Sequence, residues 1–205
     1  MILFPDGIKI TTLEQACLSH MVPDTEASIQ SSLTAKIDFC RDALIEAWRP
    51  TLFADSSVTE LPADSTALVE LIFAREDYKT RLEHDAAKDP PEALYKYATA
   101  KFEGTSRVGL TVKRPDRVPG DATVTLFASG INVADIDANC VLAYNQDLGD
   151  WVIGALMGRV NRGKKRMIKQ YYPIILADTD VTAMPGTEDG LIEMILARAD
   201  YTRGG

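Results

Sequence analysis

Asp55 and Asp77 are the residues of this chain that come closest to a catalytic pair. Two carboxyl groups can share general acid and base work, provided that the protein holds their pKa values apart. The same pair recurs 123 residues later as Asp178 and Asp200. No nucleophile, metal-ligand set or glycine-rich loop accompanies either pair in the sequence. We therefore expect no catalytic, cofactor-binding or metal-binding residues, and we interpret both pairs as structural.

The histidines and cysteines indicate no further site. His20 and His84 show neither a metal-ligand spacing nor a Ser/His/Asp arrangement, so we expect neither to be a ligand or a catalyst. Cys17 and Cys140 again lie 123 residues apart, which favours small buried side chains over reactive thiols. Three cysteines without close spacing argue against a disulfide framework or a zinc site, and a reducing cytoplasm is the expected compartment.

The sequence contains an internal repeat. Residues 48–81 and 171–204 align without a gap at an offset of 123, and the match extends upstream to give 21 identical pairs over 81 positions. Such a repeat has to be recognised first because it decides the fold class. We predict a mainly α chain made of two tandem-duplicated helical-hairpin modules, 1–81 and 124–205. An insert at 82–123 is expected to hold a helix and a small β-hairpin.

Each module is expected to begin its hairpin with a long helix. Apolar residues recur at steps of three and four over 25–48 and over 150–171, which is typical of a helix with one buried face. Pro50 and Pro173 predict a bend or a stop at the ends of these helices. The apolar stripe predicted for the first long helix comprises Ile29, Leu33, Ile37, Phe39, Cys40, Leu44, Ile45 and Trp48.

Shorter elements complete each module. A second helix is expected over 64–87 in the first module and over 187–201 in the second. A short helix at 12–20 or 134–144, after a strand-like segment, is expected to precede each hairpin.

The insert carries two segments in which apolar and polar side chains alternate. Residues 106–113 and 122–127 flank a stretch rich in Pro, Gly and Asp, and this arrangement is typical of a β-hairpin. The hairpin would form either an arm or a small sheet with residues 1–10. A further helix is expected over 90–102.

Two strings shared by the modules are expected to hold each hairpin together. Ala-Asp-x-x-Val-Thr-x-x-Pro is typical of a structured turn, in which the aspartate binds nearby amides. In Ala-Arg-x-Asp-Tyr, we predict that the arginine forms an ion pair back to that aspartate. The tyrosine is expected to pack at the hairpin base with a bonded hydroxyl. This structural repeat motif comprises Asp55, Arg75, Asp77, Tyr78, Asp178, Arg198, Asp200 and Tyr201.

A basic segment stands out in an acidic chain. The formal net charge is −8, which is not typical of a general nucleic-acid binder, yet residues 159–169 are strongly basic. The matching segment of the first module carries Asp42 and Glu46, so the fold does not require the positive charge. The segment is either a solvated face, or a contact with nucleic-acid phosphate, or a contact with an acidic surface such as another copy's first module. With Lys164 beside them, the candidate contact residues are Arg159, Arg162, Lys165, Arg166 and Lys169.

Composition excludes some classes of protein. The chain is 46% hydrophobic and 25% charged, which is ordinary for a globular protein. It has no run of 18 apolar residues, so we expect no membrane span. Its first residues are not a basic segment followed by an apolar one, so we expect no signal peptide.

One region of the sequence resembles segments of small tailed-bacteriophage proteins. It comprises residues 164–178 and the Val-Thr-x-x-Pro and Ala-Arg-x-Asp-Tyr strings that follow them. The expected architecture is similar to that of head–tail connector (adaptor) proteins, which form rings below the portal and line the DNA channel. The resemblance implies a non-enzymatic virion protein, assembled in the host cytoplasm as a homo-oligomeric ring. Its partners would be portal or tail and neck proteins, with non-specific proximity to DNA and no membrane.

Two other interpretations stay open at this stage. One is a soluble regulatory module that binds a partner or nucleic acid through the basic 159–169 helix. The other is an enzyme of unrecognised type, which should have a deep pocket with perturbed titratable groups.

Overall fold

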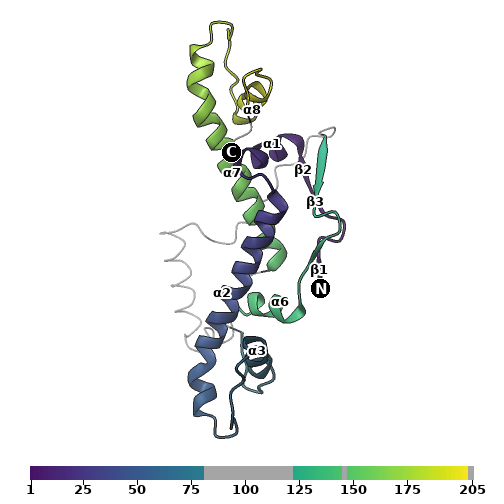
Figure 1. The fold of residues 1–205 in the computed structure, drawn as a ribbon, viewed down its shortest axis with the longest axis vertical. Helices are drawn as coiled ribbons and strands as arrows, with labels where there is room; N and C mark the ends of the chain where they lie inside the picture. Colours follow the sequence, from purple (N-terminus) through teal and green to yellow (C-terminus); the bar gives the residue numbers. More distant parts are fainter. Residues whose placement is uncertain (81–121, 145–146, 203–205) are drawn as a thin grey trace, which may run out of the picture. The chain divides into compact units, whose positions relative to one another are not determined.

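The computed structural model describes residues 1–80, 122–144 and 147–202, and this part of the chain is mainly helical, with six helices and two small two-stranded sheets (Figure 1). The predicted mainly α class is confirmed. Several features of the sequence analysis lie outside the described residues. They are the helix expected over 90–102, the strand expected over 106–113, the part of the second helix beyond residue 80, and His84.

The chain divides into two compact units, and each unit combines segments from the N-terminal half (residues 1–80) and the C-terminal half (residues 122–202). In unit 1 the hairpin is formed by α2 (Thr25–Ala54), from Ser32 onward, and α3 (Ser65–Phe73). The helix that packs on α3 is α6 (Asp135–Leu142), which comes from the C-terminal half. Figure 1 shows α3 beside the C-terminal part of α2.

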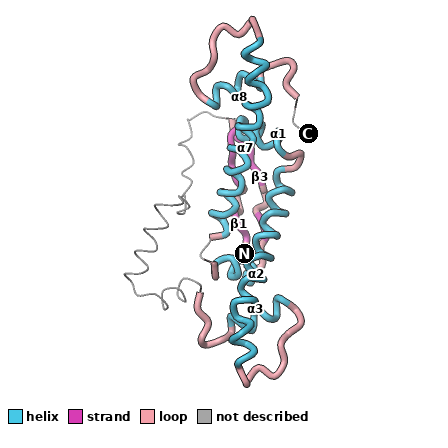
Figure 2. The backbone as a smooth tube through the Cα atoms, turned by 90° about the vertical axis from the view of Figure 1, so that its left-hand side faces the viewer, coloured by secondary structure: helices cyan, strands magenta, loops and turns pink. Residues whose placement is uncertain are grey.

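Unit 2 has the reverse composition. Its hairpin is formed by α7 (Leu148–Ala177), from Val152 onward, and α8 (Glu188–Leu196). The helix that packs on α8 is α1 (Thr12–Met21), which comes from the N-terminal half. Each hairpin is therefore covered by a short helix from the opposite half of the sequence. Figure 2 shows the loop that joins the two helices at the end of each hairpin.

The strands form two small sheets. In unit 2, β2 (Ile8–Thr11) pairs antiparallel with β3 (Thr123–Leu126), and Ile8 lies opposite Leu126. This pairing is the small sheet with residues 1–10 that the alternating 122–127 segment predicted. Elsewhere β1 (Ile2–Leu3) pairs with β4 (Ile131–Asn132).

Backbone features recur at the offset of 123 residues. The bounds of α7 are those of α2 shifted by 123, and α8 and α3 are related by the same shift. Phe4 and Phe127 both have φ near 50°, a left-handed conformation that is uncommon for residues other than glycine. The amides of Gly7 and Gly130, also at positive φ, donate to the carbonyls of Phe4 and Phe127 at 2.8 Å.

One face of each long helix is buried at matching positions. Six of the eight positions of the predicted stripe are buried, whereas Trp48 is half-buried and Phe39 is 63% exposed. The buried face steps from Ile37 to Cys40 and then to Leu44, and Phe39 lies one residue off that path, so it reaches solvent. The buried positions on α2 include Ile29, Leu33, Ile37, Cys40, Leu44 and Leu52, and those on α7 include Val152, Leu156, Val160, Met167, Tyr171 and Ile175.

The predicted helix ends need two corrections. Neither long helix stops at its proline: α2 continues past Pro50 to Ala54, and α7 continues past Pro173 to Ala177. Leu52 and Ile175 are buried in these last turns, and this burial offsets the hydrogen bond that a proline removes.

The second helices are shorter than predicted, since α3 ends at Phe73 and α8 at Leu196. The Ala-Arg-x-Asp-Tyr strings leave the helix and form turns, in which the amides of Tyr78 and Tyr201 donate to the carbonyls of Arg75 and Arg198.

Helix α1 lies close to α7 at Gly163. A Cβ atom added at this position would lie 2.3 Å from the carbonyl oxygen of Cys17, which is backbone and cannot rotate away. The position 123 residues earlier is Cys40, which carries a side chain and is buried in unit 1. Unit 2 therefore depends on glycine at a position where unit 1 accepts a larger residue.

We expect the substitution Gly163→Ala to lower the free energy of unfolding by about 1–3 kcal/mol, because the overlap with Cys17 outweighs the gain in helix propensity. Gly154→Ala is the matched control on the same helix, since a Cβ there meets no atom within 4 Å. That control should raise stability by about 0.5–1 kcal/mol. Urea unfolding measures both, and equal effects of the two substitutions would contradict the close approach of α1 to α7.

Candidate interaction surfaces

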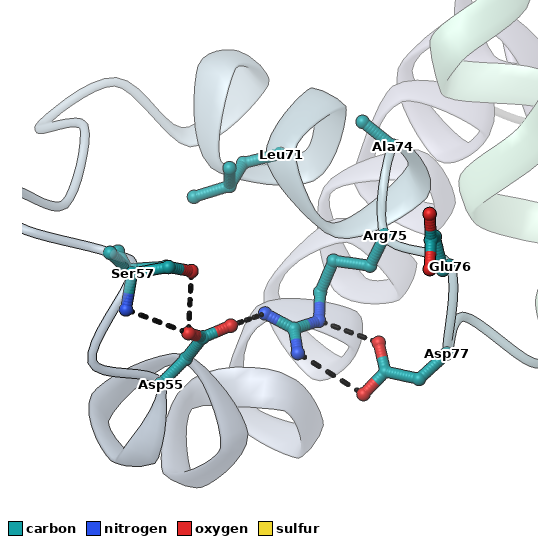
Figure 3. A pocket seen from close by; sticks show the side chains of 8 residues that line it. Asp55, Ser57, Leu71, Ala74, Arg75, Glu76 and Asp77 are labelled. Carbon is teal, nitrogen blue, oxygen red and sulfur yellow. Dashed lines mark hydrogen bonds and ion pairs between the residues drawn. The ribbon is translucent and has the colours of Figure 1, made fainter.

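Arg75 binds the turn after α2 to the segment after α3 (Figure 3). Its Nη1 donates to Asp55 Oδ2 at 2.7 Å, and its Nε and Nη2 donate to the two carboxylate oxygens of Asp77 at 2.7 and 3.1 Å. The amide and hydroxyl of Ser57 donate to the other Asp55 oxygen at 2.9 and 2.6 Å. The guanidinium also lies 6.0 Å from the ring centroid of Trp48. The ion pair that the motif predicts is present.

Arg198 makes the same set of bonds in unit 2. Its Nη1 donates to Asp178 Oδ2 at 2.7 Å, and its Nε and Nη2 donate to Asp200 at 2.7 and 3.0 Å. The amide of Asp180 donates to the remaining Asp178 oxygen at 3.1 Å. We call these two arrangements the Arg75 clamp and the Arg198 clamp. Each closes one hairpin at the point where its two helices are joined.

The predicted tyrosines pack at the base of each clamp. The Tyr78 ring lies 5.0 Å from that of Phe73 and 5.8 Å from that of Trp48, measured between centroids. The Tyr201 ring lies 5.7 Å from that of Tyr171 and is stacked on His20 at 6.1 Å. Aromatic contacts at these distances add to the stability of each hairpin.

The clamp chemistry does not suit proton transfer. Hydrogen bonds from Ser57, then from Arg75, lower the pKa of Asp55 to about 2, and the Arg75 guanidinium lowers the pKa of Asp77. Both carboxyl groups are therefore ionised at neutral pH, so this pair supplies no general acid. An open cleft of about 470 Å³ lies beside them, and its described lining contains no histidine or cysteine.

We expect Arg75→Ala to destabilise the protein at neutral pH, because it leaves two carboxylates without their shared cation. Since the folded pKa of Asp55 is depressed from 3.8 to about 2, its contribution is present above pH 4 and is lost as the pH falls toward 2. The difference between wild type and variant should shrink over that range. Arg49→Ala, which removes only an exposed pair with Glu46, is the matched control. Thermal unfolding with an unchanged midpoint in Arg75→Ala would contradict the role of the clamp.

The histidine and the three cysteines in the described part of the chain are buried. His20 is fully buried, and burial, followed by the nearby charge of Arg166, lowers its pKa, while a hydrogen bond between its ring and Gln170 acts in the opposite direction. Burial raises the pKa of the Cys17 and Cys140 thiols to about 11 in both cases, which makes them poor nucleophiles. Within the described ranges, no group of three or more His, Cys, Asp or Glu side chains could hold a metal ion.

The structure divides the basic cluster of α7 into two parts. Lys164 forms an ion pair with Asp189 of α8, and Arg159 donates to the carbonyls of Ala155 and Ser28 at 3.2 and 3.3 Å. These two cations take part in packing within unit 2. The other four are exposed, and none forms an ion pair with a described residue. This exposed set, the basic stripe, comprises Arg162, Lys165, Arg166 and Lys169.

Helix α2 has a different surface at the matching positions. Phe39, Asp42 and Glu46 are exposed there, and we call them the acidic stripe. Asp42 forms no ion pair with a described residue, whereas Glu46 has an exposed pair with Arg49 at 3.0 Å.

The ends of the two long helices expose apolar side chains that the sequence analysis missed. Phe53 is 71% exposed at the end of α2, and Leu176 is 62% exposed at the end of α7. They are 123 residues apart, so the same exposed apolar position occurs in both hairpins. The sequence carries a signal for these two exposed residues. In each half an apolar residue directly follows one that is buried, Leu52 or Ile175.

Comparison of the chain with protein-family models, with curated proteins and with solved structures gives no match. None of the helices in the described ranges is long and apolar enough to cross a membrane. The function therefore has to be argued from the residues and their geometry.

Proposed function

We propose that this chain is a non-enzymatic virion assembly protein of a tailed phage, a subunit of the head–tail connector (adaptor) type. It would act in a homo-oligomeric ring, assembled in the host cytoplasm, through contacts with portal or with tail and neck proteins. The support is the sequence resemblance of residues 164–178 and the strings after them, together with two hairpins whose polar motifs are used for structure.

We also infer that the chain is two copies of one duplicated module. The matching helix bounds, the paired positive φ angles and the two clamps all recur at one offset, and this supports the inference. Two related hairpins give one subunit two similar sets of surfaces, which suits a protein that links neighbours.

The observation that carries the proposal is the exposed apolar residue at the end of each long helix. Phe53 and Leu176 remain in solvent although burial of a side chain of this size is worth about 1.5–3 kcal/mol. The Arg75 and Arg198 clamps fix the adjoining turns, so these residues sit on ordered supports. Exposed apolar groups on a fixed support are typical of protein–protein contact sites.

The test is affinity capture of the tagged full chain from its native source, after nuclease treatment and at moderate salt, followed by mass spectrometry. We expect portal, neck or tail proteins in fixed ratio, and we expect the double variant Phe53→Ser with Leu176→Ser to lose them while its unfolding midpoint is unchanged. Leu142→Ser is the matched control, because Leu142 is also well exposed, at 56%, but lies on α6. Recovery of the chain alone, or with metabolic proteins, would contradict the proposal.

A second candidate function, nucleic-acid binding by a regulatory module, is favoured by one observation: four exposed cations on one part of α7. On duplex DNA, the logarithm of the binding constant falls linearly with the logarithm of the salt concentration, and each phosphate contact contributes about −0.9 to the slope. If this candidate is correct, Lys165→Ala with Lys169→Ala should reduce that slope by about 2 in fluorescence anisotropy. An absence of DNA binding at low salt would eliminate it.

A further inference from the structure

We propose that the basic stripe of α7 in one copy of this chain binds the acidic stripe of α2 in another copy. The inference deepens the proposed assembly function, on which it rests, by naming the two surfaces that would join subunits. It pairs Arg162, Lys165 and Lys169 of one copy with Phe39, Asp42 and Glu46 of the next.

The two stripes occupy equivalent places on matching helices. Positions 39, 42 and 46 become 162, 165 and 169 at the offset of 123, and steps of three and four residues keep each set on one helix face. At two of these places the charge is reversed, from Asp42 to Lys165 and from Glu46 to Lys169. Because the spacing is the same, two charge pairs can form together when one helix lies along the other.

The charges of both stripes are available for a partner. Asp42, Lys165 and Lys169 form no ion pair within the described part of the chain. Glu46 has only its exposed pair with Arg49, and such pairs are weak and easily exchanged.

Neighbouring cations behave differently. Arg41 forms ion pairs with Asp38 and Asp137, and Lys164, at the equivalent place on α7, binds Asp189. Both long helices therefore use the cation at this place for packing inside a unit. The additional cations of the basic stripe have no such role, and this leaves them for an external contact.

Phe39 gives the acidic stripe an apolar anchor. Its ring is 63% exposed, and the ammonium of Lys36 already lies 5.5 Å from the ring centroid. The ring thus has an accessible face of the kind that attracts cations. Arg162 of a neighbouring copy, at the matching place on α7, can stack on this ring while the two charge pairs form.

The proposed contact is heterologous, because the acidic stripe belongs to unit 1 and the basic stripe to unit 2. Each copy would offer one surface of each kind, so every copy can bind two neighbours. A heterologous contact that repeats gives a closed ring when its rotation closes and an open array when it does not. This property is what the proposed assembly function requires.

Another copy of the chain is favoured over nucleic acid as the partner that binds the basic stripe. The complement of the basic stripe, with the same spacing and the opposite charge, lies on the same chain. Nucleic acid also leaves Phe39 and the exposed acids of α2 without a role. Binding of nucleic acid to the basic stripe is therefore the alternative outcome of the experiment.

The experiment is charge-reversal complementation followed by sedimentation velocity of the full chain. One variant carries Asp42→Lys with Glu46→Lys, the second carries Lys165→Glu with Lys169→Glu, and the third carries all four changes. Wild type should self-associate at low ionic strength and dissociate near 1 M salt, where the Debye length is about 3 Å. The first two variants should each lose about tenfold or more in self-affinity. Their mixture, and the third variant alone, should associate again.

A matched control reverses two exposed acids elsewhere in unit 1, Glu60→Lys with Glu70→Lys, and should associate like wild type. Unfolding midpoints of all variants check that the fold is kept. A wild type that stays monomeric, or a mixture that does not associate, would overturn the proposal. DNA binding that is lost only in the second variant, without self-association, would assign the basic stripe to nucleic acid. Capture of virion proteins from the native source is independent of this result, so failure of the stripe contact and failure of the assembly function are distinguishable.

Discussion

The structure depends on one constraint: neither helical hairpin can bury its apolar face without a short helix from the other half of the chain. In unit 1 the covering helix α6 is fixed to α2 by the ion pair between Arg41 and Asp137 at 2.5 Å. In unit 2 the covering helix α1 lies so close to α7 that only glycine fits at position 163. A two-helix hairpin has too little apolar contact to be stable alone, and the reciprocal exchange supplies the third helix to both. It also links the two halves, because neither unit is complete without residues from both.

The two clamps give the recurring polar motif the same structural role in both hairpins. Arg75 and Arg198 use their planar guanidinium groups to hold two carboxylates each, one from the turn and one from the segment after the second helix. The turns are thereby fixed next to Phe53 and Leu176, and the apolar ends of the long helices are presented on ordered supports. The motif holds each hairpin together, and in the proposed function it also supports the exposed apolar residues that would bind a partner.

The sequence predicted much of this local structure, because local structure depends on short-range patterns. The apolar periodicity located the long helices, and the spacing of Asp55 and Arg75 indicated the ion pair. The burial of Phe39 and a helix stop at the prolines were wrong alternatives, since a one-residue departure from the buried stripe and the burial of Leu52 are decided by tertiary packing.

The exchange of short helices between halves could not be read from the pattern, because apolar periodicity indicates which face of a short helix is buried but not which hairpin covers it. The basic cluster was also predicted as one set. The separation of Lys164 from Lys165 depends on the position of Asp189, which only the folded chain fixes.

The most direct test of this account is a double-mutant cycle between Arg41 of α2 and Asp137 of α6. These two residues are 96 positions apart in the sequence. Unfolding free energies of Arg41→Ala, Asp137→Ala and the double variant give the coupling between α2 and α6. The account predicts a coupling of about 1 kcal/mol, as expected for partly buried contacting charges. Effects that add to within about 0.3 kcal/mol would contradict the exchange of α6 onto the N-terminal hairpin.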